Sequence, residues 1–209
     1  MPVLVNGKQH LLFIHVPKTA GTSMEILFQK SGWGVGYVDY GLQGTLNHLR
    51  PCSPQHMHAE MLQQQFVLHQ FSGIFMIVRH PYARFRSEYC FANQNKLDTS
   101  AAAVEAWTRK VMSVYAANPH ILDNHIRPQH EFYLPGASVY KLEEGFEKMK
   151  ADLSAMYGIQ FSNEDVREMT REKQHGFSSS DVELNDNVKA MLDVFYAEDF
   201  IKFGYERSE

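Results

Sequence analysis

The stretch that most constrains the fold lies at residues 11–23, LLFIHVPKTAGTS. Its apolar start, Leu11 to Ile14, predicts a buried strand, and Ser23–Lys30 follows the pattern of a helix. A strand that passes through a short loop into a helix suits phosphate binding. The N–H groups at the helix N-terminus point at the anion, and the helix dipole favours negative charge there.

The loop itself carries one cation and several hydroxyl groups. Lys18 supplies a mobile positive charge, and hydroxyl donors come from Thr19, Thr22 and Ser23. The loop is not a Walker A motif, because in GxxxxGK[ST] the lysine follows the second glycine, whereas here Lys18 precedes Gly21. This order favours a nucleotide other than ATP or GTP.

The rest of the chain alternates strand and helix patterns. Strands are expected at 36–40, 73–78 and 138–142, and the last helix at 188–203. The alternation predicts an α/β fold with a mostly parallel sheet and helices on both faces. With 209 residues, 44% of them hydrophobic, the chain is long enough for one such core, so we expect a single domain over residues 1–209.

Composition and charge exclude several classes of protein. No apolar run approaches the roughly 18 residues that cross a bilayer, and the N-terminus does not resemble a signal peptide, so we expect a cytoplasmic protein without a membrane span. The net charge of −4 disfavours nucleic acid as a partner. Cys52 and Cys90 do not form a disulfide framework and are expected to be reduced.

A second candidate anion site follows the strand at 73–78. Arg79 stands at its carboxyl end, where open α/β sheets bind ligands, and Ser87 lies on the next predicted helix. Taken alone, such an arginine is often an ion-pair partner, and such a serine is usually solvated. Beside a phosphate loop on a neighbouring strand, the two predict a second phosphate site, formed by a guanidinium and a hydroxyl. Two anion sites indicate a nucleotide with phosphates at two positions.

PKTAGTS after one strand and RxPxxRxxS after another resemble the sulfotransferases that use 3′-phosphoadenosine 5′-phosphosulfate (PAPS). The chain is most similar to the carbohydrate sulfotransferases, including heparan sulfate 2-O-sulfotransferases and their bacterial relatives. The resemblance implies a P-loop NTPase-like three-layer fold. It also implies that Arg79 and Ser87 bind the 3′-phosphate. The 5′-phosphosulfate would be bound by Pro17, Lys18, Thr19, Ala20, Gly21, Thr22 and Ser23.

Two later segments also resemble the family. Residues 125–129 are similar to a segment near the acceptor, which implies that Arg127 and Gln129 bind substrate. Residues 171–180 are basic and rich in hydroxyls, and relatives fold a comparable segment over the 3′-phosphate and adenine. Lys173 and Ser178 are therefore candidate cofactor-binding residues. A surface loop is an equally good interpretation of residues 171–180.

Transfer to a hydroxyl group needs a base, and histidine, with an unperturbed pKa of about 6.5, suits that task. Relatives use a histidine between the two motifs; His58 matches best, and His56 is the second candidate. In a chain with 11 histidines, both could simply belong to a polar loop. A metal site is also conceivable for HxH, but a third ligand beyond His48 or His69 is not obvious.

The resulting hypothesis is a sulfotransferase that moves the sulfuryl group of PAPS to a hydroxyl, most readily on a carbohydrate, and releases adenosine 3′,5′-bisphosphate. Lys18 would stabilise the charge on the departing phosphate, so the reaction requires no metal. One alternative is a nucleotide-dependent kinase, which would need an aspartate at a strand end for Mg²⁺. The other is a non-catalytic nucleotide- or glycan-binding module.

Overall fold

The computed structural model describes residues 2–39, 46–163 and 178–207. Its centre is a five-stranded sheet in the order β3-β1-β2-β4-β5. The strands are β1 (Val3–Val5), β2 (His10–Ile14), β3 (Gly34–Gly36), β4 (Gly73–Val78) and β5 (Ser138–Lys141). The pairs β2–β4 and β4–β5 are parallel, whereas β1 is antiparallel to both β2 and β3. Within the described residues, β1 is thus the one strand that opposes the others, which confirms a mostly parallel sheet.

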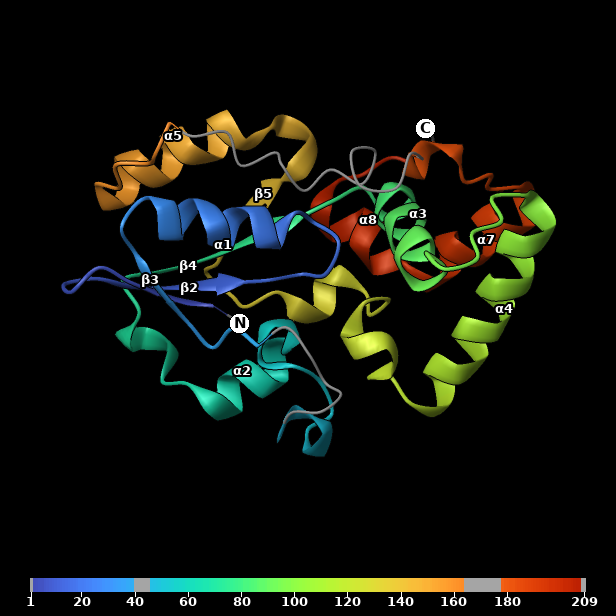
Figure 1. The fold of residues 1–209 in the computed structure, drawn as a ribbon, viewed down its shortest axis with the longest axis horizontal. Coiled ribbons are helices and arrows are strands. Elements are labelled where there is room, and N and C mark those ends of the chain that lie inside the picture. Colours follow the sequence, from blue (N-terminus) through green and yellow to red (C-terminus); the bar gives the residue numbers. More distant parts are fainter. Residues whose placement is uncertain (1, 40–45, 164–177, 208–209) are drawn as a thin grey trace.

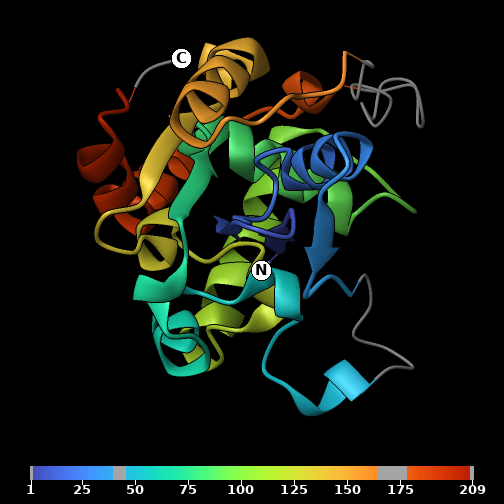
Figure 2. The same cartoon turned by 90° about the vertical axis from the view of Figure 1, so that its left-hand side faces the viewer.

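Side chains of the central strands alternate between two apolar layers. In β2, Leu11 and Phe13 pack under α1 (Gly21–Lys30) and α5 (Phe146–Tyr157), on one face of the sheet. Leu12 and Ile14 face α2 (Ala59–Gln65) on the other face. Because helices cover both faces of the sheet, the sequence of β2 is a continuous apolar run and does not alternate between apolar and polar residues. Figures 1 and 2 show these three layers, with α1 and α5 on one side of the sheet and α2 on the other.

A group of helices lies beyond the carboxyl ends of β2 and β4 (Figure 1). It consists of α3 (Pro81–Ala92), α4 (Ala101–Ala117), α7 (Asp186–Phe195) and α8 (Ala197–Phe203). Tyr82, Phe85 and Tyr89 of α3 form the stripe that packs against these helices. Pro81 occupies the first turn of α3, and the Ser100 side chain caps α4 by accepting a hydrogen bond from the N–H of Ala103. Among the helices of the described residues, none is both long and apolar enough to cross a membrane.

Short 3₁₀ segments connect these layers and form part of the site. They include η1 (Leu46–Leu49), η2 (Pro54–His56), η3 (Leu68–Gln70), η4 (Ile121–Asn124), η5 (Gln129–Phe132), η6 (Leu142–Glu144) and η8 (Ser179–Asp181). Both η2 and η4 lie at the carboxyl edge of the sheet, next to the loop that leaves β2.

Two expected elements differ from those observed, and one observed strand was not expected. The strand expected at 36–40 is wrong over its described part, residues 36–39, because β3 covers Gly34–Gly36 and pairs with β1; residue 40 lies outside the described residues. The sequence analysis did not predict β1. The helix expected at 188–203 is divided at Tyr196 into α7 and α8. Tyr196 is buried and donates its hydroxyl to the carbonyl of Ile126, and this tertiary contact accompanies the break.

Candidate functional site

Residues 17–21, which run from the loop after β2 to the first residue of α1, are called the cradle loop below. Lys18 and Ala20 both adopt left-handed backbone conformations, with φ of 68° and 63°. For residues other than glycine this conformation costs roughly 1–2 kcal/mol each, and such strain concentrates at functional sites. Left-handed residues in a loop can turn successive N–H groups toward one point, as in anion-binding loops. The two left-handed residues make the cradle loop a candidate anion-binding loop at the start of α1.

Glycine is required at position 21 because the His15 side chain approaches its Cα closely, and not because of its backbone angles. A Cβ atom at this position would lie 2.3 Å from the Cδ2 and Nε2 atoms of His15. The His15 ring thus lies directly against the first residue of α1. Its Nδ1 is 2.5 Å from a carboxylate oxygen of Glu25, which is completely buried. The sequence analysis did not single out this pair, although His15 lies within the motif that it emphasised.

Two arginines tie the cradle loop to its surroundings. Arg84 is buried and donates from Nε to the carbonyl of Pro17 and from Nη2 to the carbonyls of His125 and Arg127, at 2.6–3.1 Å. Arg79 donates from Nη1 to the carbonyl of Lys18, at 3.5 Å. The loops that follow β2 and β4 are therefore in direct contact. Arg84 was not among the residues expected to form the site.

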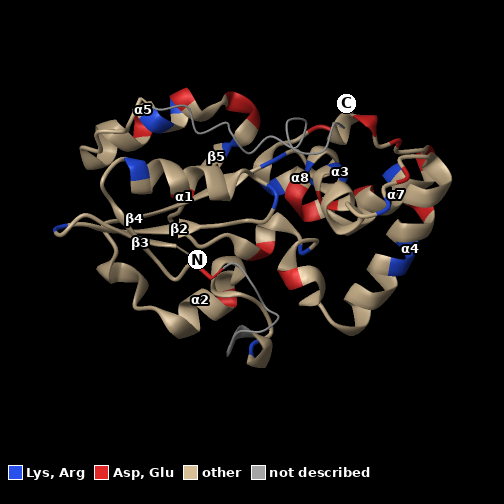
Figure 3. Cartoon of the chain, viewed as in Figure 1, with Lys and Arg blue, Asp and Glu red and all other residues tan. Residues whose placement is uncertain are grey.

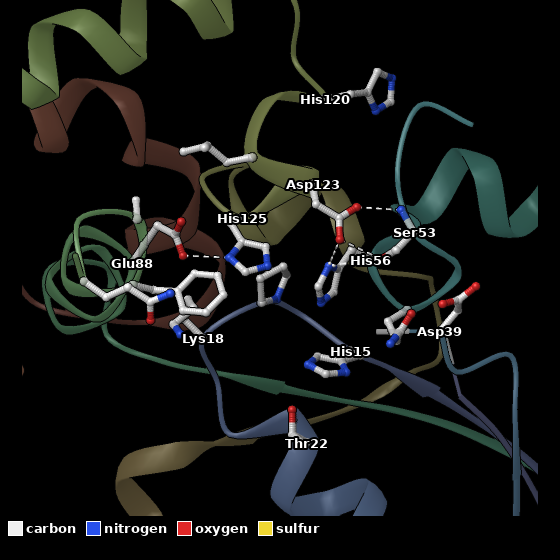
Figure 4. A pocket seen from close by; sticks show the side chains of 16 residues that line it. His15, Lys18, Thr22, Asp39, Ser53, His56, Glu88, His120, Asp123 and His125 are labelled. Carbon is white, nitrogen blue, oxygen red and sulfur yellow. Dashed lines mark hydrogen bonds and ion pairs between the residues drawn. The ribbon is translucent and has the colours of Figure 1, made fainter. Parts of the chain in front are cut away.

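A pocket of about 730 Å³ opens beside the cradle loop (Figure 4). Its size suits a nucleotide-sized ligand. It is lined by His15, Pro17, Lys18, Thr22, Asp39, Ser53, Gln55, His56, Glu88, Phe91, Ala92, Gln94, His120, Leu122, Asp123 and His125. The Nζ of Lys18 lies 4.3 Å from the centre of the Phe91 ring, which is a favourable cation–π distance.

His56 forms a pair with Asp123 in the pocket wall. Its Nδ1 lies 2.7 Å from Oδ2 of Asp123, and the same carboxylate accepts hydrogen bonds from the N–H and hydroxyl of Ser53 at 2.5 and 2.7 Å. Burial lowers the pKa of His56, against the opposing effect of the bond to Asp123. Burial acts to raise the pKa of Asp123, but the hydrogen bonds from His56 and Ser53 outweigh it and the pKa falls. The pair is thus a neutral imidazole that donates Nδ1–H to a carboxylate, so Nε2 is left as the basic atom.

Asp123 is positioned by a strained turn. Leu122, Asp123 and Asn124 have φ of 51°, 55° and 63°, which is a run of three left-handed residues. Asparagine and aspartate tolerate this conformation, but for leucine it is unusual. Asn124 fixes the turn by donating from Nδ2 to the carbonyl of His56 at 2.8 Å. Two successive residues of the turn, Asp123 and Asn124, are therefore hydrogen-bonded to the segment that carries His56.

A third histidine completes this side of the pocket. His125 has its Nδ1 2.7 Å from a carboxylate oxygen of Glu88, and its ring centre lies 4.8 Å from that of His56. The His56 ring is in turn 5.0 Å from the His15 ring. We call the group His56, Asp123, His125 and Glu88 the histidine wall. Figure 4 shows it facing the side of the pocket that Lys18 and Thr22 form.

The two candidate bases occupy different environments. His58 does not line the pocket: its Nδ1 accepts a hydrogen bond from the N–H of Met61 and so caps α2, and its ring stacks on His120 at 5.6 Å. Burial and the nearby charge of Arg127 lower the pKa of His58. Of the two, only His56 combines access to the pocket with a carboxylate partner. The geometry favours the second candidate over the first.

The other expected residues are distributed unevenly around the site. Thr22 lines the pocket, whereas the hydroxyl of Thr19 is buried and donates to the carbonyl of Val16 at 2.8 Å, so it stabilises the loop itself. Ser23 is partly buried and does not line the pocket. Ser87 is buried on α3 and does not line the pocket.

Both expected acceptor-binding residues are engaged within the protein. The buried Gln129 bonds to the backbone N–H and carbonyl of Arg79, at 2.9 and 2.8 Å. Arg127 donates to Asn124 and pairs with Glu131. Neither lines the pocket, so they act here on the backbone around it. Ser178 is the N-cap of η8, where its hydroxyl accepts a hydrogen bond from the N–H of Ser180, and Lys173 lies outside the described residues.

Comparison with known proteins gives one match. A family model described as "Sulfotransferase family" matches residues 1–206 of the chain. No curated protein and no solved structure matches it.

Proposed function

The chain belongs to the sulfotransferase family, and on this basis we propose that it transfers the sulfuryl group of PAPS to a hydroxyl group of a carbohydrate. Membership accounts for sulfuryl transfer in general and for the P-loop-like α/β fold. PAPS as donor, a carbohydrate as acceptor and a histidine base are the proposed specifics.

One observation carries the proposal: the cradle loop and the histidine wall face each other across the same pocket. One side offers N–H groups at a helix start, the Lys18 ammonium group and the Thr22 hydroxyl, which suit a phosphosulfate. The other side offers the neutral imidazole of His56, which suits a hydroxyl group that must lose its proton. A donor and an acceptor could therefore meet between them.

His56 acts as the base in this proposal. Its Nδ1–H is donated to Asp123, so Nε2 can accept the proton of the acceptor hydroxyl. Asp123 stabilises the imidazolium that forms, as a carboxylate does behind a catalytic histidine. When bound, PAPS supplies a sulfuryl group on a phosphate leaving group. Lys18 neutralises the negative charge that this phosphate gains as the acceptor oxygen bonds to sulfur and the bond to the bridging oxygen breaks.

The second phosphate of the donor is assigned to Arg79 and Ser87. Support comes from the contact between Arg79 and the Lys18 carbonyl, which puts the two loops next to each other. The hydrogen bonds of Gln129 to the backbone of Arg79 hold that strand end in place. We therefore assign Gln129 a positioning role.

The acceptor is proposed to be a neutral or small glycan. The chain has a net charge of −4, and in Figure 3 acidic and basic residues are interspersed over the described elements. A long, highly sulfated polymer would bind better to a continuous basic groove. The cytoplasmic location expected from the sequence stays a prediction.

The test starts with calorimetric titration of the protein with adenosine 3′,5′-bisphosphate, ATP and GTP. We expect binding of the bisphosphate with a Kd on the order of micromolar, much weaker binding of ATP and GTP, and at least about tenfold weaker bisphosphate binding in Arg79→Ala. A screen of glycans with PAPS follows, with transfer of sulfate as the readout. Preference for ATP, or absence of transfer to any hydroxyl acceptor, would contradict the proposal.

A further inference from the structure

The histidine wall adds His125 to the pair His56 and Asp123, and the transfer reaction gives this third side chain no role. His56, Asp123 and His125 each offer one potential metal ligand, and these atoms all lie within 4.8 Å of one another. They come from η2, from the left-handed turn and from the residue after it, and they line a pocket open to ligands (Figure 4). Two imidazoles and one carboxylate are a ligand set typical of divalent transition metals.

The residues behind these ligands also suit a metal. Metal-binding histidines almost always donate their other ring N–H to a carboxylate or carbonyl, which fixes the ring and its tautomer. His125 has this arrangement, because its Nδ1 is 2.7 Å from Glu88 and its Nε2 is the remaining ligand atom. Asp123 is held by two hydrogen bonds from Ser53. The ligands are thus oriented before any ion binds.

Charge near the group favours a cation. Asp123 and Glu88 stand directly at the two imidazoles, and Glu25 stands behind the neighbouring His15. Among the described residues that line the same pocket, Lys18 is the one lysine or arginine, and its ammonium group lies over the Phe91 ring. The local balance is therefore more acidic than a site meant only for phosphate would require.

We propose that His56, Asp123 and His125 bind one divalent transition-metal ion, of the class of Zn²⁺ or Co²⁺, and that the bound ion blocks sulfuryl transfer. An ion between His56 Nδ1 and Asp123 replaces the proton that they share, and this proton moves to Nε2 of the same ring. An ion bound at Nε2 occupies that atom directly. In both arrangements Nε2 has no free lone pair, so His56 no longer acts as a base. This inhibitory part rests on the proposed function, whereas binding itself does not.

The test uses the full chain after treatment with a chelator. Titration with Zn²⁺ by calorimetry, and with Co²⁺ by visible absorption, should show one equivalent bound, with the absorption band of nitrogen- and oxygen-coordinated Co²⁺. His125→Ala and Asp123→Ala should each weaken binding about 10- to 100-fold. His69→Ala is the matched control, because His69 is exposed on η3 and should leave affinity unchanged. Circular dichroism checks that each variant is folded.

Glu88→Gln covers the case in which a ligand variant does not fold. It keeps all three ligands and removes only the charge behind His125, and we expect affinity about tenfold lower. Absence of stoichiometric binding, or binding that His125→Ala, Asp123→Ala and Glu88→Gln all leave unchanged, would overturn the proposal.

The inhibitory part has its own readout. Transfer by the metal-free protein should fall as one equivalent of Zn²⁺ is added and return on addition of chelator. If the ion binds at the histidine wall and transfer continues, the inhibitory part is wrong. If the metal-free protein transfers no sulfuryl group at all, it is the proposed function that fails, and the binding result stands.

Discussion

The cradle loop and the histidine wall are two sides of one pocket, but they are built in opposite ways. The cradle loop is continuous in sequence: residues 17–21 carry its lysine, the Thr19 hydroxyl group and its strained backbone. The histidine wall joins residues up to 69 positions apart, since His56 meets Asp123 and His125 only in the folded chain. A local motif can be recognised from residue types alone, whereas an assembled one depends on tertiary contacts.

The largest expected effect separates the two neighbouring histidines. His56→Ala should reduce kcat by about 100- to 10,000-fold, because it removes the proposed base. His58→Ala should reduce kcat by less than about tenfold and the free energy of unfolding by at most about 1 kcal/mol, because His58 caps α2. Steady-state kinetics and chemical denaturation measure both effects. The reverse order of kcat values would move the base from the histidine wall to α2.

The next effect tests the opposite side of the pocket. Lys18→Ala should reduce kcat by about 100- to 1,000-fold, since a cation at the leaving phosphate acts mainly in the transition state. Lys30→Ala is a suitable control, because Lys30 is exposed in the last turn of α1, the helix that begins at the cradle loop. Turnover with PAPS and the best acceptor is the measurement. A comparable loss in both variants would mean that long-range charge, not position in the cradle loop, is responsible.

A third prediction concerns the contact between His15 and the start of α1. In Gly21→Ala the new methyl group would meet the His15 ring, so we expect a loss of about 1–3 kcal/mol in the free energy of unfolding. Gly34→Ala is the matched control: the nearest atom to its Cβ is 3.5 Å away, and the change should stay within about 0.5 kcal/mol. Urea denaturation of both variants gives the comparison. Equal stability of the two would show that His15 moves aside without cost.

The smallest effect is a displacement of the pH profile. His56 must be neutral to act as a base, and burial lowers its pKa below the ordinary value of about 6.5. Activity should therefore be retained as pH falls through about 6.5 and be lost only at lower pH, where His56 gains a proton. Measurement of kcat against pH, with Asp123→Asn alongside, tests this. Because Asp123 raises the pKa of His56, its loss should move the acidic limb to still lower pH. A limb at or above about 6.5 in the wild type would contradict the assignment.

Much of the fold follows from local patterns in the sequence. The four consecutive apolar residues of β2 and the matching run in β4 predict two parallel buried strands, and the pairing of Phe13 with Phe75 confirms this. The missed strand, β1, has only three residues, too few for a periodic pattern. A signal was nevertheless present, because Asn6-Gly7 after Val5 is typical of a hairpin turn and Gly7 has φ of 79°.

The site was predictable on one side and not on the other. Lys18 and Thr22 were identified because the loop carries its chemistry in consecutive residues. His56 and His58 could not be ranked from spacing, because the difference between them lies in Asp123, 67 positions away from His56. Nothing local marks Asp123, since its left-handed conformation depends on hydrogen bonds to Ser53 and His56. The single-domain expectation stays a prediction.

The left-handed turn at Leu122–Asn124 also has a consequence for the order in which the protein assembles. Its conformation is unfavourable by itself and persists only while Ser53 and His56 hold it. Contacts between such distant segments form late in folding and open early on warming, since closing a long loop has an entropic cost that local contacts avoid. We therefore expect the histidine wall to open locally before the chain unfolds as a whole. Heat should inactivate this enzyme before it melts.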